Sequence, residues 1–149
     1  MPYSLKKKAF TLIEVLLVVV IIAILAGIVI IAVNPGRQIS QTNNAQRDSD
    51  VRAILDAVVQ FSVENRGTLP AGITAVATTV GSAVGQIDIC ADIVPTYVAA
   101  MPFDPTTTGA QYTSCASYDT GYTILEDANG RVTVAAPGAE LSEVISATR

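Results

Sequence analysis

The chain has 149 residues, half of them apolar, and carries nine Lys and Arg against 13 Asp and Glu, for a net charge of −4. An acidic chain without a basic stripe argues against a nucleic-acid interface. The absence of His excludes histidine-based nucleophile activation and histidine metal ligation. No phosphate-binding or dinucleotide-binding loop is present. We therefore expect one small domain without catalytic function and without a cofactor.

The first nine residues form a short polar segment that carries every lysine of the chain, Lys6, Lys7 and Lys8. An almost wholly apolar stretch follows at residues 10–33. As a helix this stretch would span about 36 Å, enough to cross a hydrocarbon core of about 30 Å. The positive-inside rule places the lysines in the cytoplasm. The sequence therefore predicts a single-pass membrane helix followed by an exported domain.

One acid, Glu14, interrupts this apolar stretch. A secretory signal peptide does not fit the stretch, because its apolar core would be only about 7–15 residues long. A plain signal anchor fits the length but leaves Glu14 unexplained. A charge in an apolar segment is costly and usually has a partner, yet no basic residue lies within one helical turn. The partner is therefore expected on another chain; the alternative is a carboxylate that snorkels to the interface without a role.

The residues around this acid carry a resemblance to a known family. The sequence KKKAFTLIEV at residues 6–15, followed by the long apolar run, resembles the class III leader junction of type IV prepilins and pseudopilins. The resemblance implies that a prepilin peptidase/methyltransferase cuts between Ala9, where the family usually has Gly, and Phe10, and N-methylates Phe10. It also implies that Glu14, the fifth mature residue, pairs with the terminal amine of a neighbouring subunit during assembly.

The resemblance further implies a homo-oligomer, a helical filament at the cell surface. Its subunits would wait in the cytoplasmic membrane and be assembled by an ATPase and a platform protein. The favoured function is a major or minor subunit of a type IV pilus that serves adhesion, motility or DNA uptake. The first alternative is a pseudopilin of a type II secretion system. An alternative of another class is an uncleaved single-pass membrane-anchored binding domain, in which Glu14 could be replaced by Val without consequence.

Beyond the apolar run the helix is predicted to continue in an amphipathic half, residues 34–66. Asn-Pro-Gly at residues 34–36 interrupts it, because Pro lacks a backbone donor, and helix resumes after Gly36. Gly67 is expected to cap its end. An apolar stripe follows the helical spacing i, i+3, i+4 and i+7: Val51, Ile54, Leu55 and Val58.

The remaining residues, 67–149, are predicted to form a globular α+β head with a polar C-terminal tail. A small antiparallel sheet packs on the amphipathic helix, in the pilin-like plan. Strands are expected at 111–115, 122–126 and 131–135, with a hairpin turn at 127–130. A loop region is expected at 71–91, with a short strand at 86–90, and a short helix at 139–147 in the tail.

Three sets of side chains in the head are candidates for special chemistry. Cys90 and Cys115 are expected to form a disulfide in an exported domain, with two buried free thiols as the alternative. Loop aspartates provide the type of ligand that calcium prefers, but we expect them to be solvated turn residues: Asp88, Asp92, Asp104, Asp119 and Asp127. Four tyrosines are expected to pack within the strands rather than to form an aromatic surface: Tyr97, Tyr112, Tyr118 and Tyr122.

Overall fold

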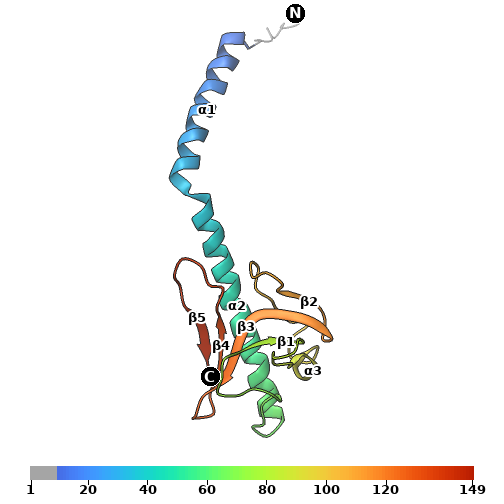
Figure 1. The fold of residues 1–149 in the computed structure, drawn as a ribbon. Coiled ribbons are helices and arrows are strands. Elements are labelled where there is room, and N and C mark those ends of the chain that lie inside the picture. The colour runs from blue at the N-terminus through green and yellow to red at the C-terminus, as the bar shows by residue number, and fades with distance from the viewer. Residues whose placement is uncertain (1–9) are drawn as a thin grey trace, which may run out of the picture. The chain divides into compact units, whose positions relative to one another are not determined.

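The computed structural model describes residues 10–149 (Figure 1). The chain divides into two compact units, with the boundary between Gln38 and Ile39. The lysines of the predicted leader, Lys6 to Lys8, and Ala9 lie outside the described residues.

The first unit is dominated by helix α1 (Leu12–Val33). Thr11 is its N-cap, with extended backbone and a side chain that accepts a hydrogen bond from the backbone of Glu14. Within α1, Leu12–Ile30 has a mean hydropathy of 3.3 and is long and apolar enough to cross a membrane. The helix ends at Asn34, whose φ of 43° is left-handed. The predicted break at residues 34–36 is therefore confirmed.

Helix α2 (Pro35–Glu64) begins immediately after this break. The prediction that helix resumes only after Gly36 was wrong by two residues. Proline is well suited to the first position of a helix, where its missing N–H would have no partner. The Asn34 side chain accepts a hydrogen bond from the backbone N–H of Arg37 (3.3 Å) and so caps the new helix. At the far end of α2, Gly67 has a φ of 89° and donates to the carbonyl of Ser62, as expected for a glycine that ends a helix.

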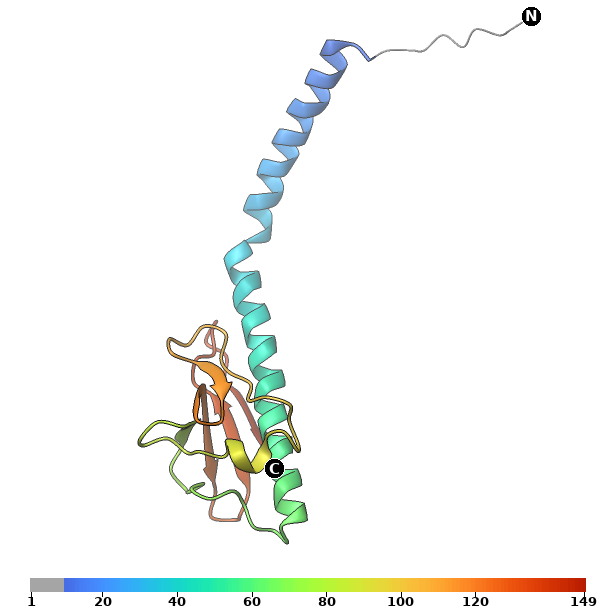
Figure 2. The same ribbon diagram turned by 90° about the vertical axis from the view of Figure 1, so that its right-hand side faces the viewer.

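The second unit places one antiparallel sheet beside α2 (Figures 1 and 2). The strands are β1 (Thr78–Gly81), β2 (Gln111–Ser114), β3 (Ser117–Glu126), β4 (Val132–Ala136) and β5 (Ile145–Thr148). They run in the order β1-β3-β4-β5, and β2 also pairs with β3. Asp119 of β3 faces both Gly81 and Gln111, so β1 and β2 lie on opposite edges of β3. Strand β2 therefore shares an edge of β3 with β4.

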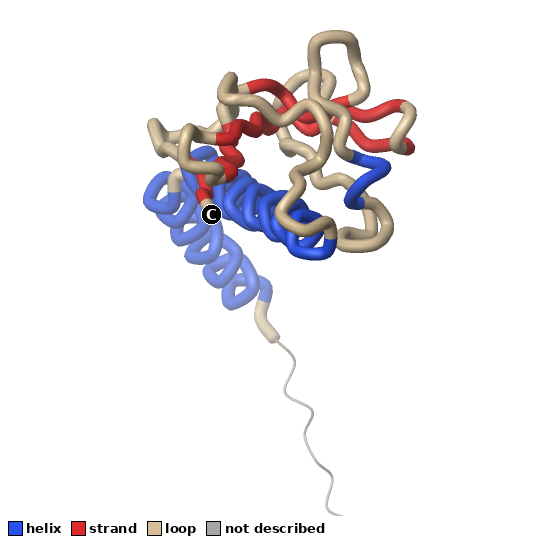
Figure 3. Tube along the Cα trace, turned by 90° about the horizontal axis from the view of Figure 1, so that it is seen from below, coloured by secondary structure: helices blue, strands red, loops and turns tan. Residues whose placement is uncertain are grey.

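The strands lie beside helix α2 (Figure 3), and the core is formed by buried side chains of the sheet and of the apolar stripe of α2. Alternate residues of β3 and β4 are buried, as period-2 strands with one covered face require. The predicted stripe of α2 is buried in the same cluster: Val51, Ile54, Leu55 and Val58. Burying one such side chain contributes roughly 1.5–3 kcal/mol. This packing confirms the α+β, pilin-like fold, in which a long N-terminal helix packs against an antiparallel sheet.

The predicted strands at 111–115, 122–126 and 131–135 correspond to β2, β3 and β4, and the turn at 127–130 joins β3 to β4. The strand predicted at 86–90 was wrong. Ile87 makes only an isolated bridge to Val80, and the strand of this region is β1, inside the predicted loop. Asp88 accepts a bond from the Cys90 N–H and directs the chain into the short helix α3 (Cys90–Ile93) instead.

The helix predicted at 139–147 was also wrong, because this segment ends in β5. Ile145 is buried and faces Ala136 of β4, so a strand covers the core better than an exposed helix would. The residues before it, 137–144, bind α2 through their side chains and backbone.

The predicted disulfide is present and joins Cys90 of α3 to Cys115, between β2 and β3. It closes a loop over a sequence separation of 25 residues. Reduction is expected to lower the free energy of unfolding by about 3 kcal/mol, because the unfolded chain regains loop entropy. Urea unfolding of the full chain in detergent, oxidised against reduced, measures this with identical side chains in both samples. A difference near zero would contradict the expected contribution.

Candidate functional site

The first turn of α1 places Glu14 at the third helical position after the N-cap Thr11. The backbone N–H of Glu14 donates to Thr11 Oγ1 at 3.3 Å. A Thr-x-x-Glu sequence is a capping-box pattern, in which the acid can accept a bond from the N-cap N–H in return. A carboxylate in the first turn also interacts favourably with the helix dipole. Thr11 thus caps α1, and Glu14 stands at the position of a capping-box acid, a pattern that the sequence analysis missed although the spacing was visible.

The carboxylate of Glu14 has no counter-ion in the described part of the chain. Within residues 10–149, Glu14 takes part in no ion pair. Phe10, four residues earlier, is 80% exposed, and Leu12 and Ile13 are similarly exposed. A cationic partner for Glu14 must therefore come from outside the described chain.

The rest of α1 is apolar around its circumference. Its described large side chains are all exposed, from Leu12 to Ile30, and none of the window Leu12–Ile30 is buried. A helix that is hydrophobic on all sides needs lipid or other helices around it. This unit alone provides neither.

Comparison with known protein families identifies a motif in this segment. Residues 4–30 match the prokaryotic N-terminal methylation motif. The chain carries the class III leader junction of type IV pilins and pseudopilins. This pilin-like chain therefore has the signature of a structural protein that a prepilin peptidase processes and that assembles into filaments. Its apolar helix is consistent with anchoring in a membrane before assembly. No curated protein and no solved structure matches the chain.

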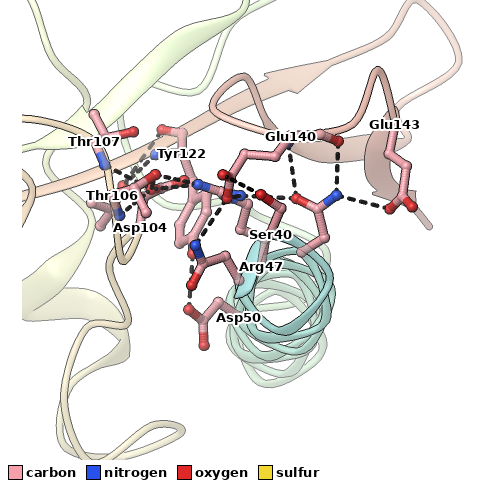
Figure 4. Close-up of polar contacts among 12 residues, drawn as sticks. Ser40, Arg47, Asp50, Asp104, Thr106, Thr107, Tyr122, Glu140 and Glu143 are labelled. Atoms are coloured by element: carbon pink, nitrogen blue, oxygen red, sulfur yellow. Dashed lines mark hydrogen bonds and ion pairs between the residues drawn. The ribbon is translucent and has the colours of Figure 1, made fainter. Parts of the chain in front are cut away.

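A second polar site lies in the head of the pilin-like chain, where Arg47 of α2 is fully buried (Figure 4). Its guanidinium contacts both carboxylate oxygens of Asp104, at 2.7 Å from Nε and 3.1 Å from Nη2. Asp104 also accepts bonds from the backbone N–H groups of Thr106 and Thr107, each at 2.8 Å. The expectation that Asp104 is a solvated turn residue was wrong, since it is 1% exposed.

The same arginine joins α2 to the C-terminal segment. Arg47 Nη1 donates to Glu140 Oε2 at 2.9 Å, and Glu140 also accepts bonds from Ser40 and Asn43. Gly138 lets the backbone of the C-terminal segment pass close to Asp104, because an added Cβ would come within 2.8 Å of Asp104 Oδ2. The hydrogen bonds that Glu140 accepts, first that from Asn43 and then those from Arg47 and Ser40, lower the pKa of its carboxyl group. The network of Arg47, Asp104 and Glu140 thus ties three segments of the head together.

Tyr112, Tyr118 and Tyr122 lie in strands as expected, but the prediction was wrong for Tyr97, which lies in the turn after α3. Tyr118 and Tyr122 are buried in β3, and burial raises the pKa of both. Tyr122 donates to Asp50 at 2.8 Å and Tyr118 donates to Asp88 at 2.8 Å. Tyr97 stands edge-on to Phe61. Across residues 10–149 the structure brings together no group of three or more side chains that could hold a metal ion.

The buried ion pair predicts how stability depends on pH. Burial raises the pKa of Asp104, but the bond from Arg47 and the N–H groups of Thr106 and Thr107 outweigh it and hold this pKa well below 3.8. A carboxyl group whose pKa is lower in the folded state stabilises the fold at pH values above its pKa in the unfolded chain. This stabilisation is lost progressively as the pH falls from there toward the folded-state pKa. Burial raises the pKa of Asp50, so this group makes the fold more stable, not less, as the pH falls.

We therefore expect the urea midpoint of the head to fall steeply only below about pH 4, where the unfolded state takes up protons. Urea titrations of the full chain between pH 7 and pH 2.5 measure this. Asp104→Asn is the matched variant, and its midpoint should start lower and change less over the acidic range. An equal acid dependence in both proteins would contradict the assignment to Asp104.

Proposed function

We propose that this chain is a subunit of a type IV pilus, made as a precursor and polymerised through its N-terminal helix. The observation that carries the proposal is the methylation motif at residues 4–30, within which an apolar helix begins with an acid that has no ion-pair partner among residues 10–149. Cleavage between Ala9 and Phe10 would remove the three lysines and create an α-amino group on Phe10. A methylated amine at that position carries the positive charge that Glu14 lacks among residues 10–149.

Polymerisation follows from the same geometry. The precursor lies in the cytoplasmic membrane, with its lysine-bearing end in the cytoplasm and its head outside, and cleavage leaves the new N-terminus at Phe10 on the cytoplasmic side. When α1 leaves the lipid it must be covered again, and neighbouring copies of α1 provide that cover. An attractive pair between Glu14 of one copy and the amine of the next would fix the axial offset between neighbouring subunits. Desolvation offsets much of the attraction, so the pair contributes register more than affinity. An assembly ATPase and a platform protein would supply the work.

A pseudopilin of a type II secretion system is the second candidate, because its leader and helix would look the same. The disulfide favours the pilin, since a covalent cross-link benefits a fibre exposed outside the cell. A pilin and a pseudopilin differ in the location of the polymer and in the process that stops when the gene is deleted.

The test is to shear the producing cells and to follow the chain by immunoblot and immunogold labelling. Long labelled surface fibres that disappear when the gene is deleted support the pilin. A chain confined to the cell envelope, with a deletion that blocks protein secretion, would instead identify the pseudopilin. A chain that stays at its full precursor mass in the membrane and forms no polymer would sink both proposals in favour of an anchored domain.

A further inference from the structure

The turn at residues 140–143 presents an exposed leucine in a backbone conformation that leucine rarely adopts. The N–H of Glu143 donates to the carbonyl of Glu140 at 3.1 Å, which closes a four-residue turn. Both central residues are left-handed, with φ of 57° at Leu141 and 59° at Ser142. Turns with positive φ at both central positions are normally built from Gly, Asn or Asp. Leu141 is 44% exposed, so burial in the core does not account for its position.

Hydrogen bonds at both ends hold this turn in place (Figure 4). Glu140 is held by Ser40, Asn43 and Arg47. Asn44, buried on α2, donates to the carbonyl of Glu140 at 2.8 Å and to the carboxylate of Glu143 at 3.0 Å. Strained residues persist where the surroundings determine them, and such residues cluster at functional positions. The strained backbone at Leu141 therefore points to a function for its exposed side chain.

The surface around the turn combines apolar side chains with an acid. Val144, just beyond the turn, is 92% exposed. Leu141, Glu143 and Val144 together are called the turn surface below. Its chemistry fits a partner that offers an apolar side chain next to a positive charge.

The opposite end of the head offers this combination. Val63, near the end of α2, is 75% exposed, and Arg66 follows it at the surface. Every other arginine of residues 39–149 forms an ion pair within the head: Arg47, Arg52, Arg131 and Arg149. No lysine occurs in this unit. Of the cations in residues 39–149, Arg66 is thus the one left available to an acid of another copy. Val63 and Arg66 are called the helix-end surface.

The two surfaces lie at opposite ends of the head. Ser40, bonded to Glu140, and Glu64, beside the helix-end surface, are 24 residues apart on α2. At 1.5 Å per residue this separation is about 36 Å. Two different, complementary surfaces at opposite ends make a heterologous contact, which propagates into an open filament rather than closing into a dimer.

We infer that the turn surface of one copy docks on the helix-end surface of another copy, with Glu143 beside Arg66 and Leu141 beside Val63. The inference rests on the proposed polymerisation and names a head-to-head contact within it. The acid and the arginine select the partner and its register, because like charges placed opposite each other are strongly disfavoured.

A charge exchange in the full chain, expressed in the producing cells, tests this contact. Glu143→Arg and Arg66→Glu are each expected to lower the amount of sheared filament by about fivefold to tenfold, because each places like charges together. The double variant Glu143→Arg/Arg66→Glu is expected to restore the filament to within about twofold of the original chain. Asp92→Arg, a charge reversal of equal size on α3, is the control and should leave the yield unchanged.

Leu141→Asn separates docking from folding. Asparagine tolerates the left-handed conformation, so the head is expected to unfold at the same urea concentration or higher, while the filament yield falls. A leucine with only a structural role predicts the reverse, a less stable head with unchanged filaments.

Three outcomes would overturn the contact: a double variant no better than the single ones, Glu143→Arg rescued by Arg37→Glu instead, or Leu141→Asn with normal filament yield. In each of these the original chain still forms filaments, so the proposed function stands. Absence of filaments from the original chain would overturn the contact and the proposed function together.

Discussion

Replacing Glu14 by Val is expected to abolish the surface filament while leaving the head folded. The acid has no ion-pair partner within the described chain, and the α-amino group that cleavage would create is the charge that suits it. Removing one partner of a desolvated charge pair costs about 2–5 kcal/mol, which corresponds to at least tenfold in affinity at every contact. Immunoblots of the sheared fraction against the membrane fraction measure the loss.

Two further variants at this position separate charge from helix capping. Glu14→Gln removes the charge but keeps an oxygen that can accept a bond from Thr11 N–H, so it should assemble as poorly as Glu14→Val. Thr11→Val removes the N-cap but keeps the charge, and is expected to cost only about 1 kcal/mol of helix stability. Normal filaments from Glu14→Val would contradict the role of the Glu14 charge in assembly.

Replacing Arg47 by Met is expected to destabilise the head by about 3–5 kcal/mol, because it leaves Asp104 buried without a counter-charge. Both side chains are fully buried, and the pair links α2 to the loop that leads into β2. Urea unfolding of the full chain in detergent gives the free energy. The filament yield should fall together with the stability of the head.

Arg52→Met is the matched control for this substitution. Arg52 lies about 1.4 turns further along α2 and pairs with Asp48 at 3.0 Å, but the two side chains are 65% and 48% exposed. Its loss is expected to cost only about 0.3–0.5 kcal/mol. The double variant Arg47→Met/Asp104→Leu should recover part of the stability, since no buried charge remains. Equal effects of Arg47→Met and Arg52→Met would show that burial of the pair is unimportant.

The features that sequence reasoning predicted correctly are those that a local pattern encodes. The apolar run of α1 and the break at Asn34 follow from hydropathy and from the chemistry of proline. The stripe through Val51 and Val58 needs only the period of a helix. The junction before Phe10 was visible as a motif, and the Thr11 to Glu14 spacing that caps α1 was equally visible but was not used.

The features that could not be predicted join residues far apart in the sequence. Arg47 meets Asp104 over a separation of 57 residues and Glu140 over 93, and no periodic pattern connects them. An arginine on a helix and an aspartate between two prolines each look solvated from their neighbours alone. The helix predicted at 139–147 failed for the same reason, because α2 and β4 determine how that segment lies.

The most direct test of the filament proposal is the mass and N-terminal sequence of the chain recovered from sheared filaments. A chain that starts at N-methylated Phe10 and is two hydrogens lighter for the Cys90–Cys115 disulfide is the predicted result, and it would establish processing and export in one sample. A chain that still starts at Met1, and is found only in the membrane, would contradict the proposal that this protein is a filament subunit.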